Sequence, residues 1–207
     1  VALAAAPVLA GCVDVLSPGG PDSRVKEDAL LFPRASGDAP PLDALEVSFW
    51  AKPGATRGAA VRYVGVASPK YSLCMEFTVP AGSLLRHPDG RAVQPGDSVR
   101  ITVRVLDPEG FRFEFAPAGL RFDASNPARL RVSYWWADRD FDGDGQTDAD
   151  DARVEESLGF WKQERPGERW TRVVTQRSPD DYELVASISG FTRYAVASNR
   201  SASTRFE

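Results

Sequence analysis

The residues best suited to do chemistry in this chain are the aspartates of one twelve-residue stretch, 140–151. Carboxylates stand at its first, third, fifth, ninth and twelfth positions, and Gly145 stands at the sixth. Because Ca²⁺ takes about six to eight oxygen ligands, oxygen donors crowded into a short turn suit it. A glycine lets the chain turn sharply there, since it has no Cβ and tolerates a positive φ. The stretch predicts a calcium site with these ligands: Asp140, Asp142, Asp144, Gln146 through its carbonyl, Asp148 and Asp151.

The same stretch resembles the calcium-binding loop of EF-hand proteins, with two departures. Its twelfth residue is Asp151 rather than glutamate, and its eighth is Thr147, where paired loops carry an aliphatic residue. The sequence holds no second loop of this kind, so the stretch resembles a single dockerin-type loop more than a sensor pair. This implies a structural site with a Kd of about 10⁻⁴–10⁻³ M, and cohesin binding does not follow. The alternative is a solvated acidic turn, because Asp and Gly are ordinary turn residues.

Short β-strands are the elements that must position this loop. Apolar and polar residues alternate most regularly over 99–105, and turn signals such as Pro95-Gly96 separate the runs. Many short strands at roughly 8–12-residue spacing, without a long helical period, predict an all-β fold, an antiparallel β-sandwich. A short helical turn over 152–158, stopped by Gly159, follows the loop between two strands. The expected strands cover residues 45–49, 61–64, 73–79, 99–105, 111–115, 130–134, 170–174, 182–188 and 194–196.

The start of the chain is apolar and ends in small residues, which is typical of a secretory signal peptide. Its last residues, Leu9-Ala10-Gly11-Cys12, resemble the bacterial lipobox, in which the cysteine carries the lipid. The sequence opens at Val1 without a basic segment, and we expect that segment to precede it. The alternative is an apolar strand or helix with a chance cysteine. We therefore expect a lipid-anchored protein of the bacterial cell envelope.

The domain organisation follows from shifts in composition. Residues 1–11 are the expected signal peptide, and 12–41, rich in Pro, Gly, Ser and Asp, are an expected flexible tether. The β-sandwich is expected over 42–198, and a polar, disordered tail over 199–207. A chain of 207 residues fits one domain with such tails.

Charge and motifs limit the function classes. The net charge of −4 provides no electrostatic footprint for nucleic acid. The sequence lacks a Ser nucleophile elbow, a P-loop and a dinucleotide fingerprint, and His87 is expected in a solvated turn, so we expect no enzyme. Cys74 is either a free, inert thiol or, if Cys12 carries no lipid, one half of a disulfide with it.

Several segments of the expected sandwich carry a shared pattern. They are Phe77-Thr-Val-Pro-Ala-Gly-Ser-Leu84, Phe115-Ala-Pro-Ala-Gly-Leu-Arg-Phe122 with the strand after it, Trp170, and Ser189-Gly-Phe-Thr-Arg-Tyr-Ala-Val196. In this order they resemble signature segments of the ZU-five domain of ankyrins, netrin receptors, zonula occludens proteins and bacterial surface proteins. The resemblance covers about residues 73–197 and implies a β-sandwich.

The closing segment of that family cleaves itself in some members, between Phe and Ser of a His-Phe-Ser triplet. The matching positions here are Gly190, Phe191 and Thr192, so the hydroxyl is kept and the histidine is lost. Because a Thr hydroxyl without a base is a poor nucleophile, we expect no self-cleavage.

The expected function is a binding or structural role for a calcium-stabilised β-sandwich, with an unknown protein or glycan partner. The alternative is an exported carbohydrate-binding or enzyme-accessory domain that uses a Trp-rich surface, with Trp135-Trp136 and Phe160-Trp161 as candidate rings. A glycan platform needs exposed, coplanar rings, whereas strand alternation places one ring of each pair in the core.

Overall fold

The computed structural model describes residues 24–200. The expected signal peptide, Cys12 and residues 201–207 lie outside the described residues. The strands are β1 Arg24–Val25, β2 Leu30–Leu31, β3 Glu46–Ala51, β4 Arg57–Arg62, β5 Leu73–Val79, β6 Leu84–Arg86, β7 Val99–Asp107, β8 Arg112–Ala116, β9 Arg121–Phe122, β10 Ala128–Ser133, β11 Gly159–Gln163, β12 Trp170–Arg172, β13 Thr175–Ser178, β14 Glu183–Ile188 and β15 Arg193–Asn199. The helices are α1 Pro69–Ser72, α2 Ala149–Ser157 and the 3₁₀ turns η1 Glu27–Ala29 and η2 Pro179–Asp181.

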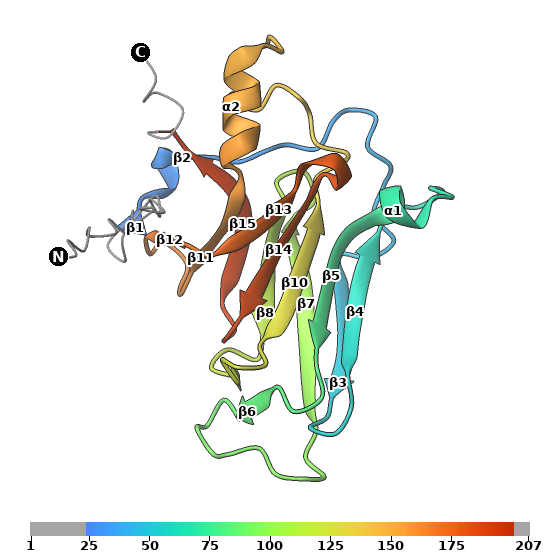
Figure 1. The fold of residues 1–207 in the computed structure, drawn as a ribbon, viewed down its shortest axis with the longest axis vertical. Coiled ribbons are helices and arrows are strands. Elements are labelled where there is room, and N and C mark those ends of the chain that lie inside the picture. Colours follow the sequence, from blue (N-terminus) through green and yellow to red (C-terminus); the bar gives the residue numbers. More distant parts are fainter. Residues whose placement is uncertain (1–23, 201–207) are drawn as a thin grey trace, which may run out of the picture.

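The strands form two antiparallel sheets that pack face to face, which confirms the predicted all-β sandwich (Figure 1). One sheet has the order β1-β12-β11-β15-β8-β7-β3, with β2 pairing with β15. The other has the order β13-β14-β10-β5-β4, and β6 with β9 makes a small separate pair. Because β3 and β4 are consecutive in the chain but belong to different sheets, they bring the two sheets together along one edge.

The core lies between the two sheets, as strand alternation requires. On β7, Ile101 and Val103 are fully buried while the side chain of Arg104 faces solvent. Aromatic rings join the layers: Phe77 of β5 meets Phe115 of β8 edge to face, with ring centroids 5.0 Å apart. This inward face of apolar side chains fixes the register, because a slip by one residue would turn it outward.

Residues 24–41 differ from the sequence expectation of a flexible tether. Leu30 and Leu31 are buried, and β2 pairs with the end of β15. Leu30 packs with Trp161 and Trp170 on the outer face of the larger sheet, where Phe32 also meets Trp170. The reason is physical: a few apolar residues within polar sequence bury enough surface to hold the segment against the rings of Trp161 and Trp170.

The run 170–174 also differs from the expectation of one strand. The chain leaves the larger sheet after β12 and enters the smaller one at β13, and Val174 between them is 90% exposed. No helix within residues 24–200 has the length and apolar character needed to cross a membrane.

Candidate metal centre

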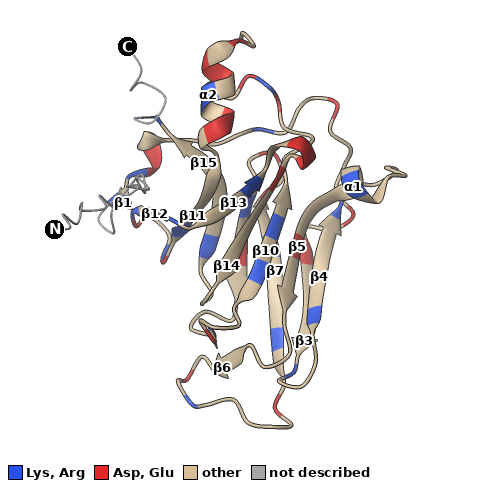
Figure 2. Ribbon diagram, viewed as in Figure 1, with Lys and Arg blue, Asp and Glu red and all other residues tan. Residues whose placement is uncertain are grey.

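The acidic stretch is a loop that leaves the sandwich after β10 and runs into α2, the helix beside β15 (Figure 1). Phe141 lies inside the loop sequence, yet its side chain is buried in the main core. Val154 and Leu158 bury the inner side of α2 in the same core. The loop is therefore held at both ends, and acidic side chains occupy much of α2 and the region before it (Figure 2).

Asp140 is the side chain around which the loop turns. Its Oδ1 accepts from the backbone N–H groups of Gly143, at 2.8 Å, and Asp144, at 3.0 Å. Its Oδ2 accepts from the N–H of Gly145 at 2.9 Å. Gly143 and Gly145 have φ of 80° and 89°, conformations that a residue with a Cβ rarely adopts. The predicted role of Gly145 in a sharp turn is thus matched by its backbone conformation.

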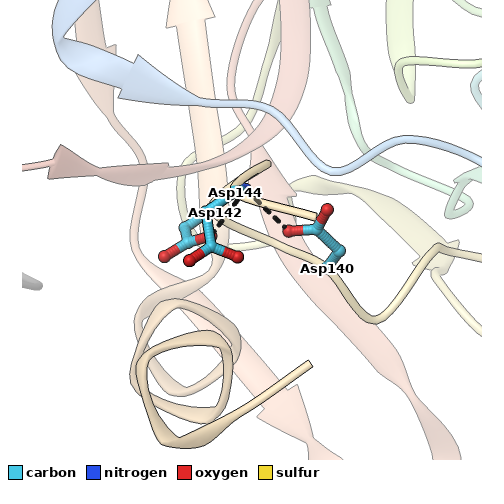
Figure 3. A group of neighbouring side chains, drawn as sticks. All are labelled: Asp140, Asp142 and Asp144. Atoms are coloured by element: carbon cyan, nitrogen blue, oxygen red, sulfur yellow. Dashed lines mark hydrogen bonds between the residues drawn. The ribbon is translucent and has the colours of Figure 1, made fainter. Parts of the chain in front are cut away.

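Three of the predicted ligands come together in space. One carboxylate oxygen from each of Asp140, Asp142 and Asp144 lies within 4.8 Å of the others (Figure 3). Desolvation, followed by the charges of the neighbouring carboxylates, raises the pKa of Asp142 above its usual range. Crowded carboxylates of this kind are stabilised by a cation, because an opposite charge favours the ionised form. The three residues could hold a metal ion.

Asp148 and Asp151 form a capping box at the start of α2. Asp148 is the N-cap, and its side chain accepts from the N–H of Asp150 at 2.8 Å. Asp151 is almost fully buried, and its Oδ2 accepts from the N–H of Asp148 at 2.8 Å. Reciprocal bonds of this kind satisfy the free N–H groups of the first helical turn. They explain why α2 begins at Ala149, three residues before the predicted 152.

Asp151 also fastens the beginning of the loop to its end. Its Oδ1 accepts from the N–H groups of Phe141, at 2.6 Å, and Asp142, at 3.1 Å. Burial by itself would raise the pKa of this carboxyl, but the three backbone N–H donors outweigh burial and hold its pKa below the usual range. Asp151 is therefore a structural anchor of the loop, a role that the ligand spacing did not reveal.

Of the six predicted ligands, three form the cluster, two form the capping box, and Gln146 lies on the loop between them. The N–H of Gln146 donates to Oδ1 of Asp144 at 2.8 Å, which holds that carboxylate beside the other two. All the clustered donors are carboxylate oxygens, which suit hard cations such as Ca²⁺ and Mg²⁺ and lack the sulfur or imidazole that zinc prefers. Coordination by Gln146, Asp148 and Asp151 stays a prediction.

Sequence reasoning missed the side chains that hold α2 on the sandwich. Glu155 accepts from the hydroxyl of Tyr134 at 3.3 Å, and Arg177 donates to that same hydroxyl at 3.3 Å. Arg139, next to the loop, points away from the carboxylates and lies over the ring of Tyr182, 4.3 Å from its centroid. One residue in the sequence did indicate that the loop is anchored to the core: Phe141, an aromatic residue inside an acidic loop.

His87 and Cys74 lie apart from this site. His87 is buried rather than solvated, and its Nε2 forms a hydrogen bond with a carboxylate oxygen of Asp97 at 2.9 Å. Cys74 is a free, buried thiol beside Tyr63, and burial raises the pKa of the thiol to about 12. A thiol in this state is protonated at neutral pH and is a poor nucleophile.

The aromatic pairs proposed for a glycan surface are largely inside the molecule. Phe160 and Trp161 are buried on opposite faces of β11. Trp135 is half-buried and stacks on Tyr71, with ring centroids 4.1 Å apart. Trp50, which sequence reasoning did not single out, is 57% exposed.

Comparison with known proteins adds no family. No protein-family model matches the chain, and no curated protein matches it either. The fold class and the aspartate cluster therefore rest on the structure alone, and the lipoprotein and ZU-five resemblances stay predictions.

Proposed function

We propose that this chain is a lipid-anchored, calcium-stabilised β-sandwich with a binding or structural role at the bacterial cell envelope. The observation that carries the proposal is the cluster of Asp140, Asp142 and Asp144 on a loop fixed at both ends. A metal bound there would hold together a connection between two sheets, so its binding energy would add to the stability of the fold. Calcium is favoured over magnesium because it accepts irregular shells of oxygen ligands.

The anchoring part of the proposal rests on the sequence at the start of the chain. The lipobox-like Leu9-Ala10-Gly11-Cys12 supports lipidation of Cys12. The ZU-five-like segments support a non-catalytic module, since the histidine of the self-cleaving triplet is replaced here by Gly190. Replacing Cys12 by serine should move the protein from the membrane fraction of a bacterial host to the soluble fraction. A membrane fraction that stays unchanged would contradict lipid anchoring.

Calorimetric titration of calcium into the purified protein tests the metal site. We expect one ion per chain and a Kd of about 10⁻⁴–10⁻³ M. Asp142→Asn keeps the shape of the side chain and removes its charge, so it should weaken binding roughly tenfold or more. Asp28→Asn is the matched control, because Asp28 is an exposed aspartate of η1 far along the chain from the loop. No binding at about 5 mM calcium, or equal binding by both variants, would contradict the proposal.

A second candidate function, glycan binding, is favoured by Trp50. This ring is 57% exposed on β3, an edge strand, and lies opposite Arg100 of β7. The hydroxyls of Ser48 and Thr102, 2.9 Å apart, lie on the same face. An exposed indole beside polar donors suits the apolar face of a sugar ring. A glycan panel on which wild type binds and Trp50→Ala does not would favour this function, and equal signals would exclude Trp50 from it.

A further inference from the structure

A small polar pocket lies where β9, β11, β12 and the turn between β14 and β15 meet. Its volume is about 200 Å³. Three cationic residues line it, together with one acidic residue, Glu164, and four residues that carry a hydroxyl group. The cationic residues are Arg121, Lys162 and Arg172, and the hydroxyls belong to Ser187, Ser189, Thr192 and Tyr194. This charge is opposite in sign to the net charge of −4 of the whole chain.

The positive charge of the pocket is not balanced by its own residues. Lys162 pairs with Glu164 at 2.6 Å, which leaves the two arginines. Within residues 24–200, neither Arg121 nor Arg172 forms an ion pair with a carboxylate. Arg172 is partly buried, and its Nη2 donates to the backbone carbonyl of Ser157 at 3.0 Å. A partly desolvated cation without a counter-charge is unfavourable, and an anion in the pocket would relieve this.

Gly190 allows the guanidinium of Arg121 to enter the pocket. A Cβ at position 190 would come within 2.6 Å of Nη1 of Arg121, so any other residue there would push the guanidinium out of this position. Two hydroxyl groups hold the turn between β14 and β15 in place. The buried hydroxyl of Tyr194 donates to the carbonyl of Gly190 at 2.8 Å, and the hydroxyl of Thr192 donates to the carbonyl of Gln163. The turn is therefore fixed, and the exposed Arg121 beside it can reach an anion from solvent.

We propose that this pocket binds a small phosphoryl oxyanion, either free phosphate or the terminal phosphate of a lipid headgroup. Guanidinium groups offer paired N–H donors that match phosphate oxygens, and serine hydroxyls offer further donors at the rim. The lining residues come from several strands, so donors could approach an anion from more than one side, as a tetrahedral anion requires. The volume is below that of pockets for drug-sized ligands, which run from about 300 Å³ upward, and so fits a small anionic group.

Titration with inorganic phosphate, in EGTA and at constant ionic strength, tests the pocket by NMR chemical shifts or calorimetry. Arg121→Gln should weaken binding roughly tenfold or more, because it removes charge-assisted hydrogen bonds. Gly190→Ala should weaken it as well, because the new methyl group displaces the guanidinium. Arg100→Gln is the matched control, since Arg100 is an exposed arginine of β7 outside the pocket and should leave binding unchanged.

A second arm separates the two sources of the phosphate. Flotation with phosphatidylcholine vesicles, with and without phosphatidic acid, measures binding to a lipid phosphate monoester. Saturable binding of inorganic phosphate that Arg121→Gln reduces supports a free anion. Binding only to phosphatidic acid, again lost in Arg121→Gln, supports a lipid headgroup. The proposal would be overturned if the protein bound neither inorganic phosphate nor phosphatidic acid. It would also be overturned if the Arg121 and Gly190 variants bound as well as wild type, or if acetate gave an equal response. Melting curves of each variant establish that it is folded.

Discussion

Asp151 gives the sharpest test of how the acidic loop is built, because its structural role can be separated from metal binding. Replacing it by asparagine keeps the size of the side chain and removes the charge. One amide oxygen can still accept from the N–H groups of Phe141 and Asp142, but the amide NH₂ then faces the N–H of Asp148. The variant therefore loses one partly buried hydrogen bond and weakens two others from charged to neutral.

The expected loss follows from these three contacts. The N–H of Asp148 is only partly buried, so loss of its hydrogen bond costs about 1 kcal/mol, and a neutral acceptor is roughly half as strong as a charged one. We expect Asp151→Asn to lower the free energy of unfolding by about 2–4 kcal/mol. For a domain of this size, about 2–4 °C per kcal/mol gives a fall in melting temperature of roughly 4–16 °C.

Thermal unfolding followed by circular dichroism, in EGTA, measures this loss with no calcium bound. The control is Asp150→Asn, because Asp150 is the exposed neighbour of Asp151 and its side chain pairs with Arg153 on the surface. Exposed ion pairs contribute about 0–1 kcal/mol, so the control should melt within about 4 °C of wild type. A melting temperature of Asp151→Asn equal to that of the control would refute the anchoring role of this carboxylate.

Three further predictions follow from the same contacts. Calcium at about 5 mM should raise stability by about 1–2.3 kcal/mol through mass action, seen as roughly 2–9 °C in melting temperature. Asp142→Asn should reduce this rise to less than about half, and an unchanged rise in the variant would contradict the site. Hydrogen bonds from the N–H of Gln94 and from His87 lower the pKa of Asp97, so this carboxylate stabilises the fold above its unfolded pKa of about 3.9, and the stabilisation is lost as pH falls through the lowered value. The difference between wild type and Asp97→Asn in urea unfolding should therefore be smaller at pH 3 than at pH 6, and a constant difference would contradict this reasoning. The hydroxyl of Thr192 is bonded to a backbone carbonyl and His87 to Asp97, so we expect a single full-length band on a denaturing gel, and a split there would contradict the absence of self-cleavage.

Sequence predicted the strands best where side-chain alternation is strict. The run 73–79 alternates and ends at Pro80, and β5 covers Leu73–Val79. The two-residue strands β1 and β2 were missed because two residues cannot show a period of two. The division of 170–174 between two sheets was missed for a related reason. Local pattern fixes which face a residue takes, whereas the choice of partner strand depends on contacts far along the chain.

The metal loop shows the same division between local and distant information. Spacing along the chain was sufficient to bring Asp140, Asp142 and Asp144 together, because all three lie within one turn of backbone. The capping box of Asp148 and Asp151 was also present in the sequence as two acidic residues three apart, and it was read only as a pair of ligands. The anchoring of the loop by Phe141 depends on the whole core and could not be read locally.

The contacts of Asp151 also bear on how tightly an ion could be held. A carboxylate has about four lone-pair sites, and three of those of Asp151 already accept backbone N–H groups. One site remains for a cation, unless the capping box is broken at a cost in stability. The clustered aspartates add donors from one side, so water must complete a shell of about six to eight oxygens. A loop that divides its carboxylates between folding and ligation in this way is expected to bind calcium weakly.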